Sequence, residues 1–163
     1  MSIESRNVEA KLAERGLVLP DAPAAAANYV PFVEAAGLLH IAGQIPFDED
    51  GKLMCGTVGD DVTTDEAYAI AQRCALAIMA QAKAALGSLD RVGRIVKLNV
   101  FVASAPGYNE QPKVANGASD LFADLFGDAG RHARSAVGVA ALPLGVAVEI
   151  DALIEPVRAT DGA

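Results

Sequence analysis

The sequence predicts a single α+β domain in which helices cover one face of a mixed β-sheet. The chain has 163 residues, which suits one compact domain. Apolar residues make up 52% of the chain, enough to bury a core. Strand-like and helix-like segments follow one another in the order ββ–α–β–α–ββ, without an internal repeat.

Two elements are predicted near the N-terminus from residue spacing. Residues 3–15 indicate a short helix with Val8 and Leu12 on one side. Residues 29–46 follow a proline-interrupted linker. They predict a β-hairpin, because apolar side chains alternate around a turn at Gly37.

The longest periodic segment predicts a helix over residues 67–86, where apolar residues recur every three or four positions. Thr63 and Glu66 have the spacing of a capping box, and Gly87 is a typical helix stop. Residues 91–104 are rich in β-branched side chains and predict a central strand.

A second helix and two strands are predicted toward the C-terminus. Residues 113–127 have helical spacing, although Gly117 weakens the helix near its start. Two short apolar segments, 132–141 and 146–153, flank the sequence Leu-Pro-Leu-Gly. We interpret that sequence as a tight turn between two antiparallel strands.

These last strands carry an arginine and a glutamate among small side chains. With a tight turn, side-chain alternation puts Val137 on the apolar face with Ile150. Arg134 and Glu149 then share the other face, above alanines and glycines that leave space for a small polar ligand. About 13 Å along the strands separates the two positions. One small molecule would therefore reach both only through a bend, converging side chains or a neighbouring subunit. The simpler alternative is that both are solvated surface residues.

Composition and charge exclude several classes of function. The formal net charge of −8 argues against a nucleic-acid partner. We find neither a membrane-spanning segment nor a signal peptide in the sequence. Cys55 and Cys74 form no CxxC pair, so we expect reduced thiols and a cytoplasmic protein. With two histidines and no clustered ligands, neither a metal nor another cofactor is expected.

Four stretches stand in one order along the chain. They are APAAAANYVPFVEAAG, LLHIAGQIP, GSLDRVGRIVKLNVFVAS and ARSAVGVAALPLGVAVEIDALI. Together they resemble the Rid family (reactive intermediate deaminases, also called the YjgF or L-PSP family). That family has a Gly-Gln-Ile/Leu-Pro strand and a closing Arg-Ser, Leu-Pro and Val-Glu-Ile signature. The helix at 3–15 and a longer loop at 104–113 are additions that indicate a longer branch of the family.

The resemblance implies a chorismate-mutase-like α+β fold that forms homotrimers, with ligand sites in clefts between subunits. A neighbouring chain would then complete each site and cover the exposed face of the sheet. On this basis the chain divides into an N-terminal helical extension, a Rid-like domain and a short tail, at residues 1–19, 20–156 and 157–163.

The resemblance also implies site residues at matching positions. The arginine that binds the substrate carboxylate corresponds to Arg134, and the acid that positions water corresponds to Glu149. Further substrate contacts correspond to Tyr29, Gly43 and Asn116. The residues alone leave simpler alternatives open, since Tyr29 also fits a packed edge aromatic and Asn116 a helix cap.

Two positions depart from the family pattern. Ala42 stands where a serine is usual, and Ala136 stands where a cysteine is common. Both changes remove polar groups from the expected pocket. His132 lies two residues before Arg134, and we favour an exposed loop histidine over the alternative that it assists binding or titrates near neutrality.

The activity that the resemblance implies is hydrolysis of 2-imino acids, or their enamine tautomers, to 2-oxo acids and ammonia. Arg134 would hold the carboxylate beside the C=N bond through two parallel hydrogen bonds. Glu149 would orient water and exchange its proton. One alternative is a non-catalytic trimeric binder of small carboxylates such as 2-oxo acids. Another is a ribonuclease, against which the acidic charge and sparse aromatic residues argue.

Overall fold

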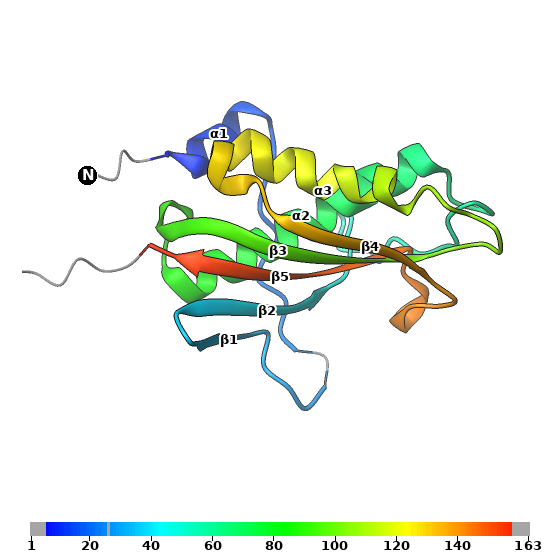
Figure 1. Ribbon diagram of the computed structural model, residues 1–163, viewed down its shortest axis with the longest axis horizontal. Helices are drawn as coiled ribbons and strands as arrows, with labels where there is room; N and C mark the ends of the chain where they lie inside the picture. The colour runs from blue at the N-terminus through cyan, green and yellow to red at the C-terminus, as the bar shows by residue number, and fades with distance from the viewer. Residues whose placement is uncertain (1–5, 26, 158–163) are drawn as a thin grey trace, which may run out of the picture.

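The strands form one mixed sheet with the helices on one side of it (Figure 1), as predicted. The computed structural model describes residues 6–25 and 27–157. The strand order is β1-β2-β5-β3-β4, and only β3 and β4 pair in parallel. The strands are β1 (Phe32–Ala35), β2 (Leu38–Gln44), β3 (Val92–Ala103), β4 (Ala133–Val139) and β5 (Val148–Pro156).

The helices begin and end close to the predicted positions. α2 (Thr64–Leu86) starts with the predicted capping box, in which the Thr63 side chain accepts from the Glu66 backbone N–H. α3 (Gln111–Phe126) starts slightly earlier than predicted. α1 (Val8–Glu14) is shorter than the predicted 3–15, and residues 3–5 of that prediction lie outside the described residues.

The predicted hairpin between the last two strands is wrong. β3 lies between β4 and β5 and pairs with both. The reason is the position of α3, which connects β3 to β4. This helix carries the chain back toward the end of the sheet where β3 begins, so β4 runs parallel to β3. Leu-Pro-Leu-Gly is a short 3₁₀ turn with Leu144 at φ 59°, and it is part of a longer connection to the far side of β3.

The change in pairing reverses the two faces of β4 relative to those of β5, compared with the prediction. Arg134 pairs with Leu98 of β3, which faces the helices and is fully buried. Val137 and Glu149 both pair with Phe101, so they share the face that carries no helix. Arg134 and Glu149 therefore lie on opposite faces of the sheet, contrary to the prediction.

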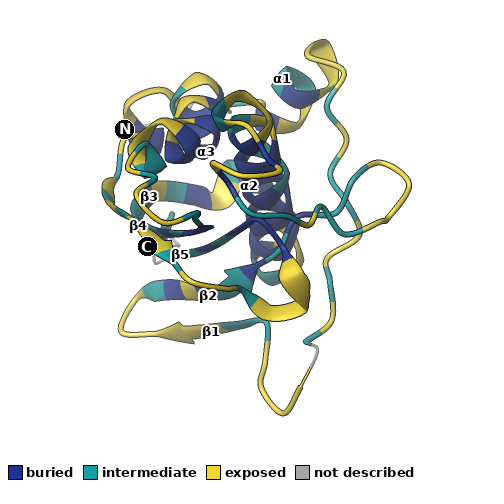
Figure 2. Ribbon diagram, turned by 90° about the vertical axis from the view of Figure 1, so that its right-hand side faces the viewer, coloured by how far each residue is buried: buried dark blue, intermediate teal, exposed yellow. Residues whose placement is uncertain are grey.

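The core lies between the sheet and the α2/α3 pair, where Figure 2 shows most of the buried residues. The predicted core thiol Cys74 is fully buried there, and burial raises its pKa. Gly117 allows close approach of the two helices, because a Cβ at this position would lie 2.0 Å from the Tyr68 carbonyl oxygen. Within the described residues, none of the helices has the length and apolar character needed to cross a membrane.

Candidate functional site

Arg134 lies at the edge of the sheet, where its side chain reaches the exposed side of α3. Its Nη1 donates to Asn116 Oδ1 at 2.8 Å and to Ser119 Oγ at 3.0 Å. Its Nη2 donates to the Pro112 carbonyl oxygen at 3.3 Å. His132 joins the group, because its Nε2 lies 2.9 Å from Ser119 Oγ. We call Arg134, Asn116, Ser119 and His132 the arginine half-site.

The surroundings of Arg134 leave it free to bind an anion. A guanidinium has five N–H groups, and the three described hydrogen bonds leave two of them without a described partner. All three acceptors are neutral, and no ion pair within residues 6–25 and 27–157 includes this arginine. Arg134 therefore keeps both its positive charge and two donors, which is what a bidentate carboxylate contact requires.

A cavity of about 300 Å³ lies beside this group. Ser119, His132 and Arg134 line it, together with Asp120, Ala123 and Arg131. Asn116 lies inside α3, whose N-cap is Glu110, so the alternative of a helix cap is wrong for Asn116. Its amide oxygen instead helps to fix the guanidinium beside the cavity.

Glu149 is the centre of a second group of polar residues, on the face of the sheet without helices. Gly43 packs against its carboxylate so closely that a Cβ at this position would lie 2.0 Å from Glu149 Oε1. On the same face, Asn99 Nδ2 donates to Asp151 Oδ1 at 2.8 Å. We call Gly43, Glu149, Asp151 and Asn99 the glutamate half-site. A larger residue at position 43 would displace the Glu149 carboxylate from this position.

The environment of Glu149 favours its protonated form. Partial burial raises the pKa of this carboxyl group, and the nearby Asp151 charge raises that pKa further. A carboxylate whose pKa is raised toward neutrality is a better base for abstracting a proton from water. The glutamate half-site therefore has the chemistry of a general base.

The structure brings together some predicted site residues and separates others. Arg134 meets Asn116, and Glu149 meets Gly43, each as one half-site. The two half-sites lie on opposite faces of the same sheet, so one small ligand cannot contact both within a protomer. Tyr29 lies in the segment before β1 and is 50% exposed.

Ser119 was not among the predicted site residues, and the prediction of an exposed His132 is wrong. The imidazole is half-buried rather than exposed, and its Nδ1 lies 2.7 Å from the Gly130 carbonyl oxygen. Phe122 packs edge-on against the ring with centroids 6.1 Å apart. The signal that was available is helical spacing, since Asn116 and Ser119 are three residues apart and face the same neighbour.

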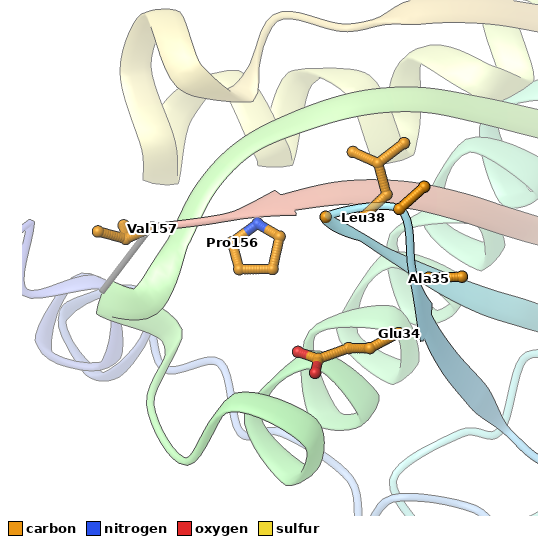
Figure 3. Close-up of a pocket in the computed structure, with 7 residues that line it drawn as sticks. Glu34, Ala35, Leu38, Pro156 and Val157 are labelled. Atoms are coloured by element: carbon orange, nitrogen blue, oxygen red, sulfur yellow. The ribbon is translucent and has the colours of Figure 1, made fainter. Parts of the chain in front are cut away.

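A cavity of about 410 Å³ lies on the face without helices, and the predicted site residue Gly43 lines it together with Asn99 and Asp151. The pocket in Figure 3 lies between the β1–β2 turn and the end of β5 and has a volume of about 290 Å³. In the described part of the chain, no group of three or more His, Cys, Asp or Glu side chains could hold a metal ion.

Comparison with known proteins agrees with this architecture. The family model described as "YjgF/chorismate_mutase-like, putative endoribonuclease" matches residues 9–154. Protein TCP17 of Trypanosoma cruzi is 53% identical over 154 residues, covering 94% of this chain and 96% of TCP17.

Solved structures show the same relationship. Atu1372 of Agrobacterium tumefaciens, described as having unknown function, is 49% identical with a TM-score of 0.86, covering 93% of this chain and 94% of Atu1372. RidA from an Antarctic Psychrobacter is 32% identical with a TM-score of 0.59, covering 83% of this chain and 94% of RidA. The better fit of Atu1372 agrees with a longer branch. The chain belongs to the YjgF/Rid (L-PSP) family, with its α+β, chorismate-mutase-like fold.

Proposed function

We propose that this chain hydrolyses 2-imino acids and their enamine tautomers to 2-oxo acids and ammonia. The observation that carries the proposal is the pair of N–H groups left on Arg134, whose described partners are all neutral. The substrate has a carboxylate next to its C=N bond, and a guanidinium matches that carboxylate with two parallel hydrogen bonds. Binding in this way fixes the imine carbon relative to the protein.

The proposed catalytic sites lie in clefts between the protomers of a homotrimer. Arg134 and Glu149 face opposite sides of one sheet, so a site that contains both needs the glutamate of a neighbouring protomer. The face without helices also exposes apolar side chains, with Val33 48% and Val137 46% exposed. A neighbouring protomer would cover these side chains, and closed homo-oligomers commonly cover apolar surface in this way.

In the proposed mechanism, Arg134 holds the substrate carboxylate while Glu149 orients a water molecule toward the imine carbon. The water oxygen bonds to that carbon, and Glu149 accepts a proton from the water as the C=N double bond becomes single. The carboxylic acid then returns the proton to nitrogen. Glu149 next takes the hydroxyl proton of the aminol and passes it to nitrogen as the C–N bond breaks, which releases the 2-oxo acid and ammonia, so the protein needs neither a nucleophile nor a redox step.

Glu149→Gln should lower kcat for 2-iminopropionate hydrolysis by about 100-fold, a low value for general base catalysis because water alone still attacks the imine. The wild-type kcat should fall as pH decreases through the raised pKa of Glu149, because protonation removes the base. The variant should lack this acidic limb. The measurement is imine trapping with semicarbazide across the acidic range, and an identical limb in both proteins would contradict the role of Glu149.

A mixing experiment tests whether the sites lie between protomers. Arg134→Ala and Glu149→Gln chains, unfolded together in equal amounts and refolded, should recover about a quarter of the wild-type activity, because random assembly joins an intact arginine to an intact glutamate in that fraction of clefts. Each variant refolded alone is the control. If both residues acted within one protomer, mixing would restore nothing.

One observation favours a second candidate, a non-catalytic binder of small carboxylates. Ala42 and Ala136 stand where the family pattern has a serine and a cysteine, so polar side chains are missing beside both half-sites. Arg134 would serve a binder equally well. Pyruvate binding that depends on Arg134, without any turnover of 2-iminopropionate, would favour this second candidate.

A further inference from the structure

A continuous chain of hydrogen bonds runs from Arg134 into the protein. Arg134 Nη1 lies 3.0 Å from Ser119 Oγ, and Ser119 Oγ lies 2.9 Å from His132 Nε2. His132 Nδ1 lies 2.7 Å from the carbonyl oxygen of Gly130. The chain therefore connects the charge of Arg134 to a titratable ring through the Ser119 hydroxyl.

The direction of each hydrogen bond follows from what its partners can donate. The Gly130 carbonyl only accepts, so His132 Nδ1 carries a hydrogen. In the neutral ring, Nε2 then has a free lone pair and accepts from the Ser119 hydroxyl. That arrangement leaves the lone pairs of Ser119 Oγ to accept from Arg134. The neutral tautomer thus satisfies all three links without conflict.

We propose that Ser119 and His132 are positioning residues for Arg134, and that carboxylate binding at Arg134 and protonation of His132 favour each other. The identity of the ligand as a small carboxylate rests on the proposed function. The connection between the ring and the guanidinium rests on the hydrogen bonds and on the cavity of about 300 Å³ that both residues line.

The charges around His132 give the coupling its sign. Burial lowers the pKa of His132 and the Arg134 charge lowers it further, against the opposing effect of the Gly130 hydrogen bond. A carboxylate on Arg134 would offset the positive charge and raise the pKa of the imidazole. Binding then takes up a proton, so carboxylate affinity increases as pH falls through the lowered pKa of His132.

Two other charged groups that line this cavity have hydrogen-bond or ion-pair partners of their own. Asp120 of α3 lines the same cavity and accepts from the Tyr68 hydroxyl at 2.9 Å. Arg131 also lines the cavity and pairs with Asp128 at 3.4 Å. Arg134 and His132 both hydrogen-bond to Ser119. Neutralising the charge of Arg134 should therefore raise the pKa of His132 more than neutralising the other charges should.

The experiment is a titration of the histidine ring signals by NMR, with and without pyruvate as the probe. The chain has two histidines, so the signal missing from His132→Gln belongs to His132. In the wild-type protein, saturating pyruvate should raise the pKa of His132 by about 0.5, which corresponds to about threefold tighter binding at low pH than at high pH. Calorimetry at pH 7.5 and at a pH below both His132 titration midpoints measures the same factor independently.

Variants separate positioning from folding. Glutamine at position 132 can still accept from Ser119 but does not titrate, so pyruvate affinity in His132→Gln should be the same at both pH values, without the threefold gain. Ser119→Ala should weaken pyruvate binding by about tenfold, since Arg134 loses a fixed acceptor. Ser119→Thr keeps the hydroxyl and should restore binding. Backbone NMR spectra check that each variant is folded.

The outcomes distinguish this inference from the proposed function. If pyruvate binds through Arg134 but leaves the His132 titration unchanged, the coupling is wrong while the proposed function stands. If His132→Gln keeps the full pH dependence, another group is responsible and the inference is also overturned. If the wild-type protein binds no pyruvate at either pH, the assignment of Arg134 as a carboxylate site fails, and both proposals fail with it.

Discussion

Arg134→Ala should lower kcat/KM for 2-iminopropionate hydrolysis by about 1,000-fold or more while the protein stays folded. Loss of one partner from a desolvated charge pair typically costs 2–5 kcal/mol, roughly 30-fold to several thousand-fold in rate. The described partners of the guanidinium are neutral acceptors at the edge of the sheet, and solvent can replace it there. The measurement is semicarbazide trapping of the imine released by an amino-acid oxidase, with thermal unfolding as the check on folding.

Two further substitutions make this result specific. Arg134→Lys keeps the charge but cannot form two parallel bonds, so it should retain only part of the activity, with a loss on the order of 10- to 100-fold. Arg15→Ala is the matched control, since Arg15 also contacts α3 but through an exposed ion pair with Asp124 at 2.5 Å. It should change kcat/KM by less than about twofold. Full activity in Arg134→Ala would remove the proposed function.

Gly117→Ala should destabilise the protein by about 3 kcal/mol or more, despite the higher helix propensity of alanine. The added Cβ would lie 2.0 Å from the Tyr68 carbonyl oxygen and 3.2 Å from Ala71 Cβ. Backbone atoms of α2 cannot rotate away as a flexible side chain can, so the two helices must separate. For a domain of this size, the thermal midpoint should fall by roughly 10 °C.

Gly87→Ala is the control for the effect of glycine itself. Gly87 ends α2 at φ +84° and a Cβ there would meet open space. This substitution should therefore cost only about 1 kcal/mol, the ordinary penalty for alanine in a left-handed conformation. If Gly117→Ala were as stable as the wild-type protein in urea and thermal unfolding, the close contact between α2 and α3 would not contribute to stability.

The elements that sequence analysis predicted well are those with strong local signals. The capping box at Thr63 and Glu66 and the long apolar periodicity behind it define α2 almost to the residue. The turn at Gly37 separates β1 from β2 as predicted. These signals are local because neighbouring residues alone satisfy the hydrogen bonds and the spacing that define a helix or a hairpin.

The pairing of the last strands was wrong for a physical reason. Leu-Pro-Leu-Gly has the residues of a tight turn, but turn chemistry does not specify which strand the chain joins next. The choice depends on α3, which returns the chain beside β3 and makes β4 a parallel edge strand. A change of pairing partner also changes which side chains share a face. Arg134 therefore lies on the helix side of the sheet, and not on the open side with Glu149 as predicted.

The family motifs in the sequence were sufficient to predict Arg134, Glu149, Gly43 and Asn116 as site residues. Only the tertiary structure decided their partners: Asn116 and Ser119 on the guanidinium, Gly43 against the carboxylate, and His132 behind Ser119. Residue types and local spacing determine which groups are available for chemistry. Contacts between α3, β4 and β5 depend on packing between segments far apart in the chain, and no local pattern encodes that packing.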